Sequence, residues 1–336
     1  MNYKVLSCKV VGACLLLLMG ACQQAPRVVP VSYKQDFPID TAVSVKTFPH
    51  GSDLAQPNVI RRMGNDRVLV SGDYYESGIF SYPDLNYIRK ITMPHDYKRF
   101  IGDTCIRQVS GKNIDVFVLR NDSLCKSSSF VVEKPHIIMR SEELSPGIYV
   151  RADNKDFPGM HEFHIIDTNR RKWISKGSYP EDNSRFKRME DFKYAYCHYV
   201  KAKPDKSAFA VIYETLSRIR IYNAEGEMQQ DVFIEGTAGN YKVVPTRFME
   251  RYHIFPETVV TDNYIYLLNN IGKTWTNATP TNILVLDWQG NLIAKYRPDV
   301  SIRHFLVDEQ RNMICGTCWK EGEGIVFFTM DILHKI

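Results

Sequence analysis

The sequence predicts an all-β protein, a six-bladed β-propeller of four-stranded antiparallel blades whose ring is closed by an N-terminal strand. Three observations lead to this fold. Short alternating strands fill the chain after residue 35, a strand–turn–strand unit recurs, and the last unit is one strand short. With 336 residues, 44% of them hydrophobic and 12% aromatic, the chain can bury one large core. We expect residues 36–336 to form that single domain.

The N-terminus carries an export signal. Lys4 and Lys9 precede an apolar run over residues 10–19, which is shorter than the roughly 20 residues that a membrane-spanning helix needs. Gly20-Ala21-Cys22 then resembles the lipobox of bacterial lipoprotein precursors, which implies cleavage before Cys22 and attachment of a diacylglycerol to it. We therefore expect a lipoprotein signal peptide over residues 1–22 that ends at the lipidated Cys22. The alternative is an ordinary signal peptide that contains a cysteine.

Residues 23–35 are polar and contain proline, as expected of a flexible tether. By resemblance to other bacterial lipoproteins, Gln23 stands where an aspartate would signal retention in the inner membrane. We expect attachment to the outer membrane through the lipid anchor, with the protein facing the periplasm. Display on the cell surface stays open.

The strands are predicted by period-two alternation of Val, Ile, Tyr and Phe with polar residues, bounded by turn residues. No stretch after the signal peptide has a long amphipathic helical pattern. The clearest predicted strands cover residues 67–71, 114–119, 163–166, 207–213 and 264–268.

A repeat appears when the turns are aligned. Asp84, Asp167, Asn223 and Asp287 occupy equivalent positions before a turn, and in the later units a glycine supplies the positive φ that reverses the chain. If one further unit lies between the first two positions, each unit has roughly 40–60 residues, the size of a four-stranded blade. A chain of this length then holds about six blades.

Ring closure follows from the two ends of the chain. The last unit ends with the strand at residues 325–330 and lacks a fourth strand, whereas residues 42–48 form a spare strand near the N-terminus. We expect the spare strand to complete the last blade.

The C-terminal units resemble a known family. Residues 287–291, Tyr296, residues 305–309 and residues 312–314 resemble the last blades of TolB-like six-bladed β-propeller lipoproteins, and the resemblance covers residues 205–330. It implies a six-bladed propeller on a lipid anchor and implies no catalytic activity. The Cys-Gly-Thr-Cys run at residues 315–318 departs from the family, which usually carries an aromatic and polar run there.

Five cysteines follow Cys22, namely Cys105, Cys125, Cys197, Cys315 and Cys318. An exported protein can form disulfides, and an odd number leaves at least one thiol free. Cys315 and Cys318 have Cys-x-x-Cys spacing, but on a strand residues three apart point to opposite faces. We therefore favour two small core residues over a redox or zinc site, and expect no metal or cofactor.

Other polar motifs are weaker. In the His-Glu-Phe-His run at residues 161–164, Glu162 and His164 share a strand face, and an exposed pair is favoured over a metal or general-base role. The adjacent carboxylates at residues 142–143, 190–191 and 308–309 are expected to be solvated. For the tyrosines at positions 194, 196 and 199, packing between blades is favoured over a recognition surface.

The net charge of +5 is spread without a basic stripe, so we expect no nucleic-acid partner. The leading hypothesis is a non-enzymatic binding or scaffolding module of the cell envelope for a protein or glycan. Two long interruptions, residues 176–192 and 237–252, supply the candidate partner-binding residues Tyr179, Phe186, Arg188, Tyr241, Arg247 and Phe248. The rival hypotheses are a glycan hydrolase or lyase with its active site in the central channel, and a purely structural role.

Overall fold

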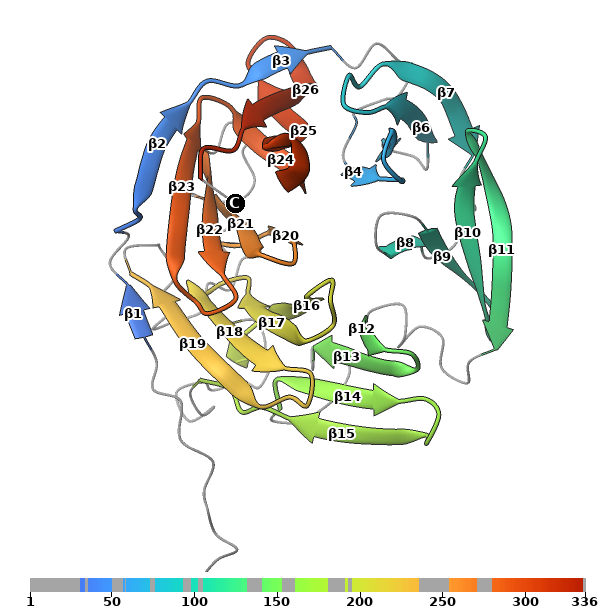
Figure 1. Ribbon diagram of the computed structural model, residues 1–336, viewed down its shortest axis with the longest axis vertical. Helices are drawn as coiled ribbons and strands as arrows, with labels where there is room; N and C mark the ends of the chain where they lie inside the picture. The colour runs from blue at the N-terminus through green and yellow to red at the C-terminus, as the bar shows by residue number, and fades with distance from the viewer. Residues whose placement is uncertain are drawn as a thin grey trace, which may run out of the picture.

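The protein is a six-bladed β-propeller, as predicted from its sequence (Figure 1). The computed structural model describes residues 31–33, 36–49, 57, 59–72, 76–92, 98–101, 105–131, 141–152, 161–180, 191–192, 195–235, 254–270 and 280–334. Six antiparallel sheets stand around a central axis, and the first strand of each blade lies nearest to that axis.

The blades follow one another along the chain, and each contributes its strands from the axis outward. Blade 1 contains β4 (Val59–Arg62), β5 (Arg67–Ser71), β6 (Glu76–Ser81) and β7 (Tyr87–Thr92). Blade 2 contains β8 (Lys98–Ile101), β9 (Cys105–Ser110), β10 (Asn113–Arg120) and β11 (Ser123–Val131). Blade 3 contains β12 (Glu142–Ser145), β13 (Ile148–Ala152), β14 (Phe163–Asp167) and β15 (Lys172–Lys176).

The second half of the ring has the same order. Blade 4 contains β16 (His198–Ala202), β17 (Ala208–Tyr213), β18 (Arg218–Asn223) and β19 (Met228–Ile234). Blade 5 contains β20 (Glu257–Val260), β21 (Tyr264–Asn270), β22 (Thr281–Asp287) and β23 (Leu292–Pro298). Blade 6 contains β24 (Ser301–Asp308), β25 (Met313–Lys320) and β26 (Gly324–Asp331).

The predicted repeat is confirmed. Asp167, Asn223 and Asp287 end the third strands of blades 3, 4 and 5, and Asp84 lies in the turn after the third strand of blade 1. The unit expected between Asp84 and Asp167 is blade 2. The turn glycines of blades 4 and 5 have φ values of +77° and +83°, a conformation that residues with a Cβ adopt only at a cost.

An N-terminal strand closes the ring, as predicted. Strand β3 (Lys46–Phe48) pairs antiparallel with β26 and becomes the outer strand of blade 6, with Phe48 opposite Phe327. The predicted single strand over residues 42–48 is in fact two strands. Val43 belongs to β2 (Ile39–Val43), which pairs in parallel with β23, and the chain leaves that sheet where the Asp299 carboxylate accepts the Val45 N–H at 3.0 Å.

A further strand, β1 (Val31–Tyr33), pairs in parallel with β19 of blade 4. Strands β1, β2 and β3 therefore form an N-terminal belt around the rim of blades 4, 5 and 6 (Figure 1). The belt begins inside the segment expected to be a tether. Cys22 and the rest of the signal peptide lie outside the described residues.

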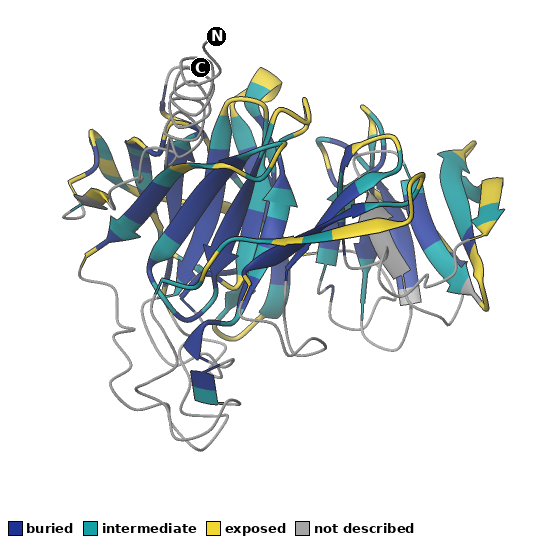
Figure 2. Cartoon of the chain, turned by 90° about the horizontal axis from the view of Figure 1, so that it is seen from below, coloured by how far each residue is buried: buried dark blue, intermediate teal, exposed yellow. Residues whose placement is uncertain are grey.

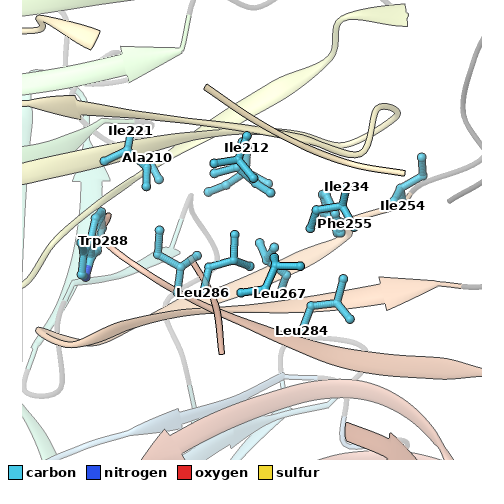
Figure 3. Packing of buried hydrophobic residues seen from close by; sticks show 14 of the residues in the cluster. Ala210, Ile212, Ile221, Ile234, Ile254, Phe255, Leu267, Leu284, Leu286 and Trp288 are labelled. Atoms are coloured by element: carbon cyan, nitrogen blue, oxygen red, sulfur yellow. The ribbon is translucent and has the colours of Figure 1, made fainter. Parts of the chain in front are cut away.

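The core is divided among the boundaries between neighbouring blades, because each of the two faces of a sheet is covered by a different neighbouring blade. The buried residues run along the middle of the strands and the exposed residues gather at the turns (Figure 2). At the boundary of blades 4 and 5, side chains of β17 and β18 face those of β21 and β22 (Figure 3). No helix of the described chain is long and apolar enough to span a membrane.

The strand order gives the disk two different faces. The turns between first and second strands, and between third and fourth strands, lie on one face, which we call the turn face. The outermost strand of each blade leaves toward the next blade from the opposite face, which we call the connection face. Both long interruptions, residues 176–192 and 237–252, join an outermost strand to the next innermost strand and therefore start and finish at the connection face.

Candidate functional site

The innermost strands surround a central channel with a volume of about 1560 Å³. Its lining contains charged side chains from all six blades, including Asp308 of β24. Arg61 and Arg62 come from β4, Arg107 from β9, Glu143 from β12, Lys201 from β16 and Glu257 from β20. The turn face contributes residues 261–263 and 309–310 to the same channel, and the C-terminal residues 332–334 also line it.

Three side chains from three blades meet at one place, and we call them the channel triad. The Glu257 carboxylate lies 3.0 Å from Arg61 Nη1 and 2.6 Å from His304 Nδ1. Glu257 is the first residue of β20, and His304 lies in the first half of β24. Because both strands start at the connection face, the triad lies toward that end of the channel.

The triad has a defined charge state at its centre. Burial alone would raise the pKa of Glu257, but His304 and Arg61 outweigh burial and hold that pKa below its ordinary value. The carboxylate is therefore ionised at neutral pH and can only accept hydrogen bonds, so Nδ1 of His304 carries a hydrogen. Within the described chain, His304 Nε2 and Arg61 Nε and Nη2 have no hydrogen-bond partner, while Arg61 Nη1 also donates to the Ile60 carbonyl at 2.9 Å.

Two other channel carboxylates, Glu143 and Asp308, are held by arginines. Glu143 lies 3.3 Å from Arg107 Nη2. Asp308 lies 3.3 Å from Arg62 and 2.7 Å from Arg311, and it accepts the Tyr82 hydroxyl at 3.0 Å. Burial would raise the pKa of Asp308, but the bonds from Arg311 and Tyr82 keep it low. Except for the Arg311 pair, these contacts connect neighbouring blades.

The prediction that the carboxylate pair at residues 308–309 is solvated is wrong for Asp308, which is 1% exposed. Two of its partners, Tyr82 and Arg62, lie more than two hundred positions earlier in the chain, so no local pattern could indicate them. Glu143 of the pair at residues 142–143 is partly exposed, and Glu190 lies outside the described residues.

The prediction of an exposed pair at Glu162 and His164 is also wrong, because both side chains are buried. Glu162 is fully buried at the boundary of blades 3 and 4, where it accepts hydrogen bonds from Tyr213 and Tyr222 and pairs with Arg220 at 2.9 Å. Arg220 also lies 3.0 Å from Asp231. The network is a structural joint between two blades, with the charge of each member balanced by a neighbour.

The expectation that Cys315 and Cys318 are core residues on opposite strand faces is confirmed. Both lie on β25; Cys315 packs at the boundary of blades 6 and 1, and Cys318 at the boundary of blades 5 and 6. Burial raises the pKa of both thiols, that of Cys318 to about 12, so both are protonated and unreactive. No disulfide joins any of the five cysteines in the described part of the chain. In the described part of the chain, no group of three or more His, Cys, Asp or Glu side chains could hold a metal ion.

Of the six predicted partner-binding residues, only Tyr179 is described. Its ring is half-buried and lies 5.0 Å from the ring of Phe192 and 5.8 Å from that of Tyr196, so it packs at the boundary of blades 3 and 4. The other five candidates, Phe186, Arg188, Tyr241, Arg247 and Phe248, lie outside the described residues.

The packing expectation for the tyrosine cluster fits its two described members. Tyr196 is buried, and the Tyr199 hydroxyl donates to the Phe255 carbonyl at 3.1 Å and lies 2.7 Å from Thr258 Oγ1. Tyr194 lies outside the described residues.

Comparisons with known proteins give the fold alone. No family model matches the chain and no curated protein matches it, so the resemblance to TolB-like lipoproteins stays a prediction. A solved structure of a Bacteroides fragilis protein, described as exported, covers 90% of this chain and 99% of its own, with a TM-score of 0.54 and 8% identity. A DUF4221 family member from Bacteroides vulgatus covers 85% of this chain and 97% of its own, with a TM-score of 0.49 and 9% identity. The chain is thus similar in fold to a protein of nearly the same extent that is described as exported.

Proposed function

We propose that the protein is a non-enzymatic binding module of the cell envelope that holds a protein or glycan partner at its connection face. The observation that carries this proposal is the state of the channel carboxylates. Glu257 and Asp308 both have lowered pKa values, since arginine or histidine partners hold them ionised. A glycan hydrolase needs a carboxyl group whose pKa is raised so that it can donate a proton. Of the described carboxyl groups with a shifted pKa, each is shifted downward.

The connection face is the favoured binding surface for a topological reason. The two longest interruptions both start and finish there, and loops on a rigid scaffold are where recognition residues usually lie. The turn face has short turns, several of which are fixed by internal hydrogen bonds such as those of Asp287 with residues 289 and 291. Residues that must adapt to a partner are better carried by the connection face.

The envelope location rests on the signal sequence and on the similar exported propeller. Attachment through a lipid on Cys22 at the outer membrane, facing the periplasm, is part of the proposal. Labelling cells with a fatty-acid analogue tests it directly. We expect label on the wild-type protein and none on Cys22→Ala. Equal labelling of both proteins would remove the lipid anchor from the proposal.

A pull-down from detergent-solubilised envelope tests the binding role. We expect a reproducible partner on the wild-type bait, and loss of that partner when residues 182–189 or 238–250 are replaced by a short Gly-Ser linker. The matched control replaces Arg170 and Arg171 on the turn face with glutamine and should keep the partner. Retention of every partner by both loop variants would contradict the proposed binding surface.

A further inference from the structure

We infer that the channel triad is a binding site for a carboxylate group, which Arg61 and His304 contact and Glu257 positions. The inference deepens the proposed function, since it names the chemistry that a ligand would offer at the connection-face end of the channel. It stands on the geometry of three side chains from blades 1, 5 and 6.

The donors are available and held in place. Arg61 Nη1 donates to the Glu257 carboxylate, and His304 Nδ1 lies 2.6 Å from the other oxygen of the same carboxylate, so both side chains approach it from one side. The remaining groups, Arg61 Nε and Nη2 and His304 Nε2, are without a hydrogen-bond partner among the described residues. The side chains of Arg61 and His304 are 33% and 30% exposed, whereas that of Glu257 is 10% exposed. The two outer members can thus reach a ligand, and the inner member is shielded.

The charge balance selects an anion. Glu257 neutralises one positive charge, and a protonated His304 leaves the triad with a net charge of +1. A guanidinium and an imidazolium side by side can each donate to a carboxylate, and charge-assisted hydrogen bonds of this kind are the strong ones. A metal cation is disfavoured because Arg61 occupies the position of a ligand on Glu257.

Binding must be linked to a proton. The anion is bound by the form of His304 that carries hydrogens on both ring nitrogens, because a neutral ring fixed by Glu257 presents a lone pair at Nε2. The charged groups that face His304 are Glu257 on β20 and, through the same carboxylate, Arg61 on β4. Affinity for the anion should therefore be greater in acidic than in alkaline solution, and Glu257 should be needed for that difference.

The test is calorimetric titration of the mature, detergent-solubilised protein with two acidic probes, digalacturonate and the dipeptide glutamyl-glutamate. Matched neutral probes, which carry no carboxylate, are digalactose and N-acetyl-glutaminyl-glutaminamide. We expect at least one acidic probe to bind and both neutral probes to fail. Binding of digalacturonate alone would identify a sugar acid as the source of the carboxylate, and binding of the dipeptide alone would identify a peptide.

Substitutions distinguish the residues that contact the ligand from the residue that positions them. Arg61→Gln should weaken binding of the acidic probe by at least about tenfold, which is the affinity expected from one charge-assisted hydrogen bond. His304→Gln should abolish the gain in affinity between about pH 8 and about pH 5.5. Glu257→Gln should flatten the same pH profile although it does not touch the ligand. Arg170→Gln on the turn face is the matched control, since its side chain is 84% exposed and lies outside the channel.

Three results would overturn the inference. These are failure of both acidic probes to bind, unchanged affinity in Arg61→Gln with a native melting temperature, and tighter binding of inorganic phosphate than of either acid. A different outcome is possible for folded Arg61→Gln: it could lose binding of the acidic probe and still retain the pull-down partner. That result would show that the triad is not part of the surface that binds the partner. In that case the carboxylate site stands and the partner is held elsewhere on the connection face.

Discussion

The boundary between blades 4 and 5 and the boundary between blades 2 and 3 are built differently. Among the described residues, the first buries fifteen hydrophobic residues and the second buries three, Ile114, Tyr149 and Ile166. Blades 4 and 5 also carry the belt strands β1 and β2 on their rims, whereas blades 2 and 3 have four described strands each. Among the described residues, packing is therefore uneven around the ring, and the boundary between blades that carry belt strands buries more hydrophobic side chains.

The largest effect is expected at the boundary of blades 3 and 4. Glu162→Ala should lower the free energy of unfolding by about 4 kcal/mol, because Arg220 stays buried and keeps only one of its two carboxylate partners, Asp231. The matched change, at the boundary of blades 2 and 3 where no belt strand lies, is Glu143→Ala. It breaks a partly exposed ion pair with Arg107 and should lower the free energy of unfolding by less than about 1 kcal/mol. Urea unfolding of both variants measures the difference. Equal losses would mean that burial does not distinguish the two ion pairs.

The next prediction compares the two hydrophobic boundaries directly. Ile265 and Ile114 are both fully buried. Ile265→Ala should cost about 4 kcal/mol and Ile114→Ala about 2 kcal/mol, since a small cluster can close around the missing atoms more easily than a large one. Chemical denaturation checks the order. A larger loss from Ile114→Ala would contradict the uneven packing.

Ring closure should contribute no more than the smaller of the two boundaries. Phe48→Ala removes a half-buried ring whose centroid lies 6.0 Å from that of Phe327, and we expect a loss of about 2 kcal/mol. Val31→Ala at the start of the belt is the control; this side chain is exposed, so its loss should stay within about 0.5 kcal/mol. Thermal unfolding measures both variants. If Val31→Ala proved as costly as Phe48→Ala, the belt would have to stabilise the ring along its whole length.

The smallest effect concerns pH and lies at blade 5, which carries the belt strand β2. His334 packs against blade 5, with Nδ1 2.6 Å from the Tyr296 hydroxyl and Nε2 3.1 Å from the Tyr266 hydroxyl. Burial lowers the pKa of His334, and Glu309 offsets only part of that shift. Since the folded pKa lies below the unfolded value of 6.5, the unfolded chain binds the proton first.

The stability from His334 is therefore complete above about pH 6.5 and is lost as the pH falls through the folded pKa. We expect wild-type unfolding free energy to drop between about pH 8 and about pH 5 by more than that of His334→Gln. Identical pH profiles for the two proteins would show that other groups control the acid response.

The sequence predicted the repeat and the closing strand because both are local signals. Alternating strands over residues 207–213 and 264–268, and the turns after Asn223 and Asp287, can be recognised within one unit of the chain. The partners of β1 and β2 could not be predicted in this way. Parallel pairing on the rim has no connecting turn, and the belt strands are only three to five residues long.

The candidate site was missed for a related reason. Arg61, Glu257 and His304 belong to three units that the ring brings together, and no motif in the sequence links them. The one available sign was that each lies at the start of a blade, where the strand faces the axis. For Glu162 the prediction of exposure was wrong. A charged residue beside apolar strand positions suggests exposure, and its buried partners come from a later blade that the local sequence does not reveal.

Ring closure by β3 also determines when the protein can finish folding. The Lys320 ammonium and the Thr47 hydroxyl, which meet at 3.2 Å across the closing sheet, are 273 positions apart. Contacts this distant in sequence form late and slowly, because the whole intervening chain must first be ordered. A chain still emerging from the ribosome or passing through an export channel has no β26 to receive β3. The closed disk is thus available only after β26 has been made, which would suit the exported protein proposed above.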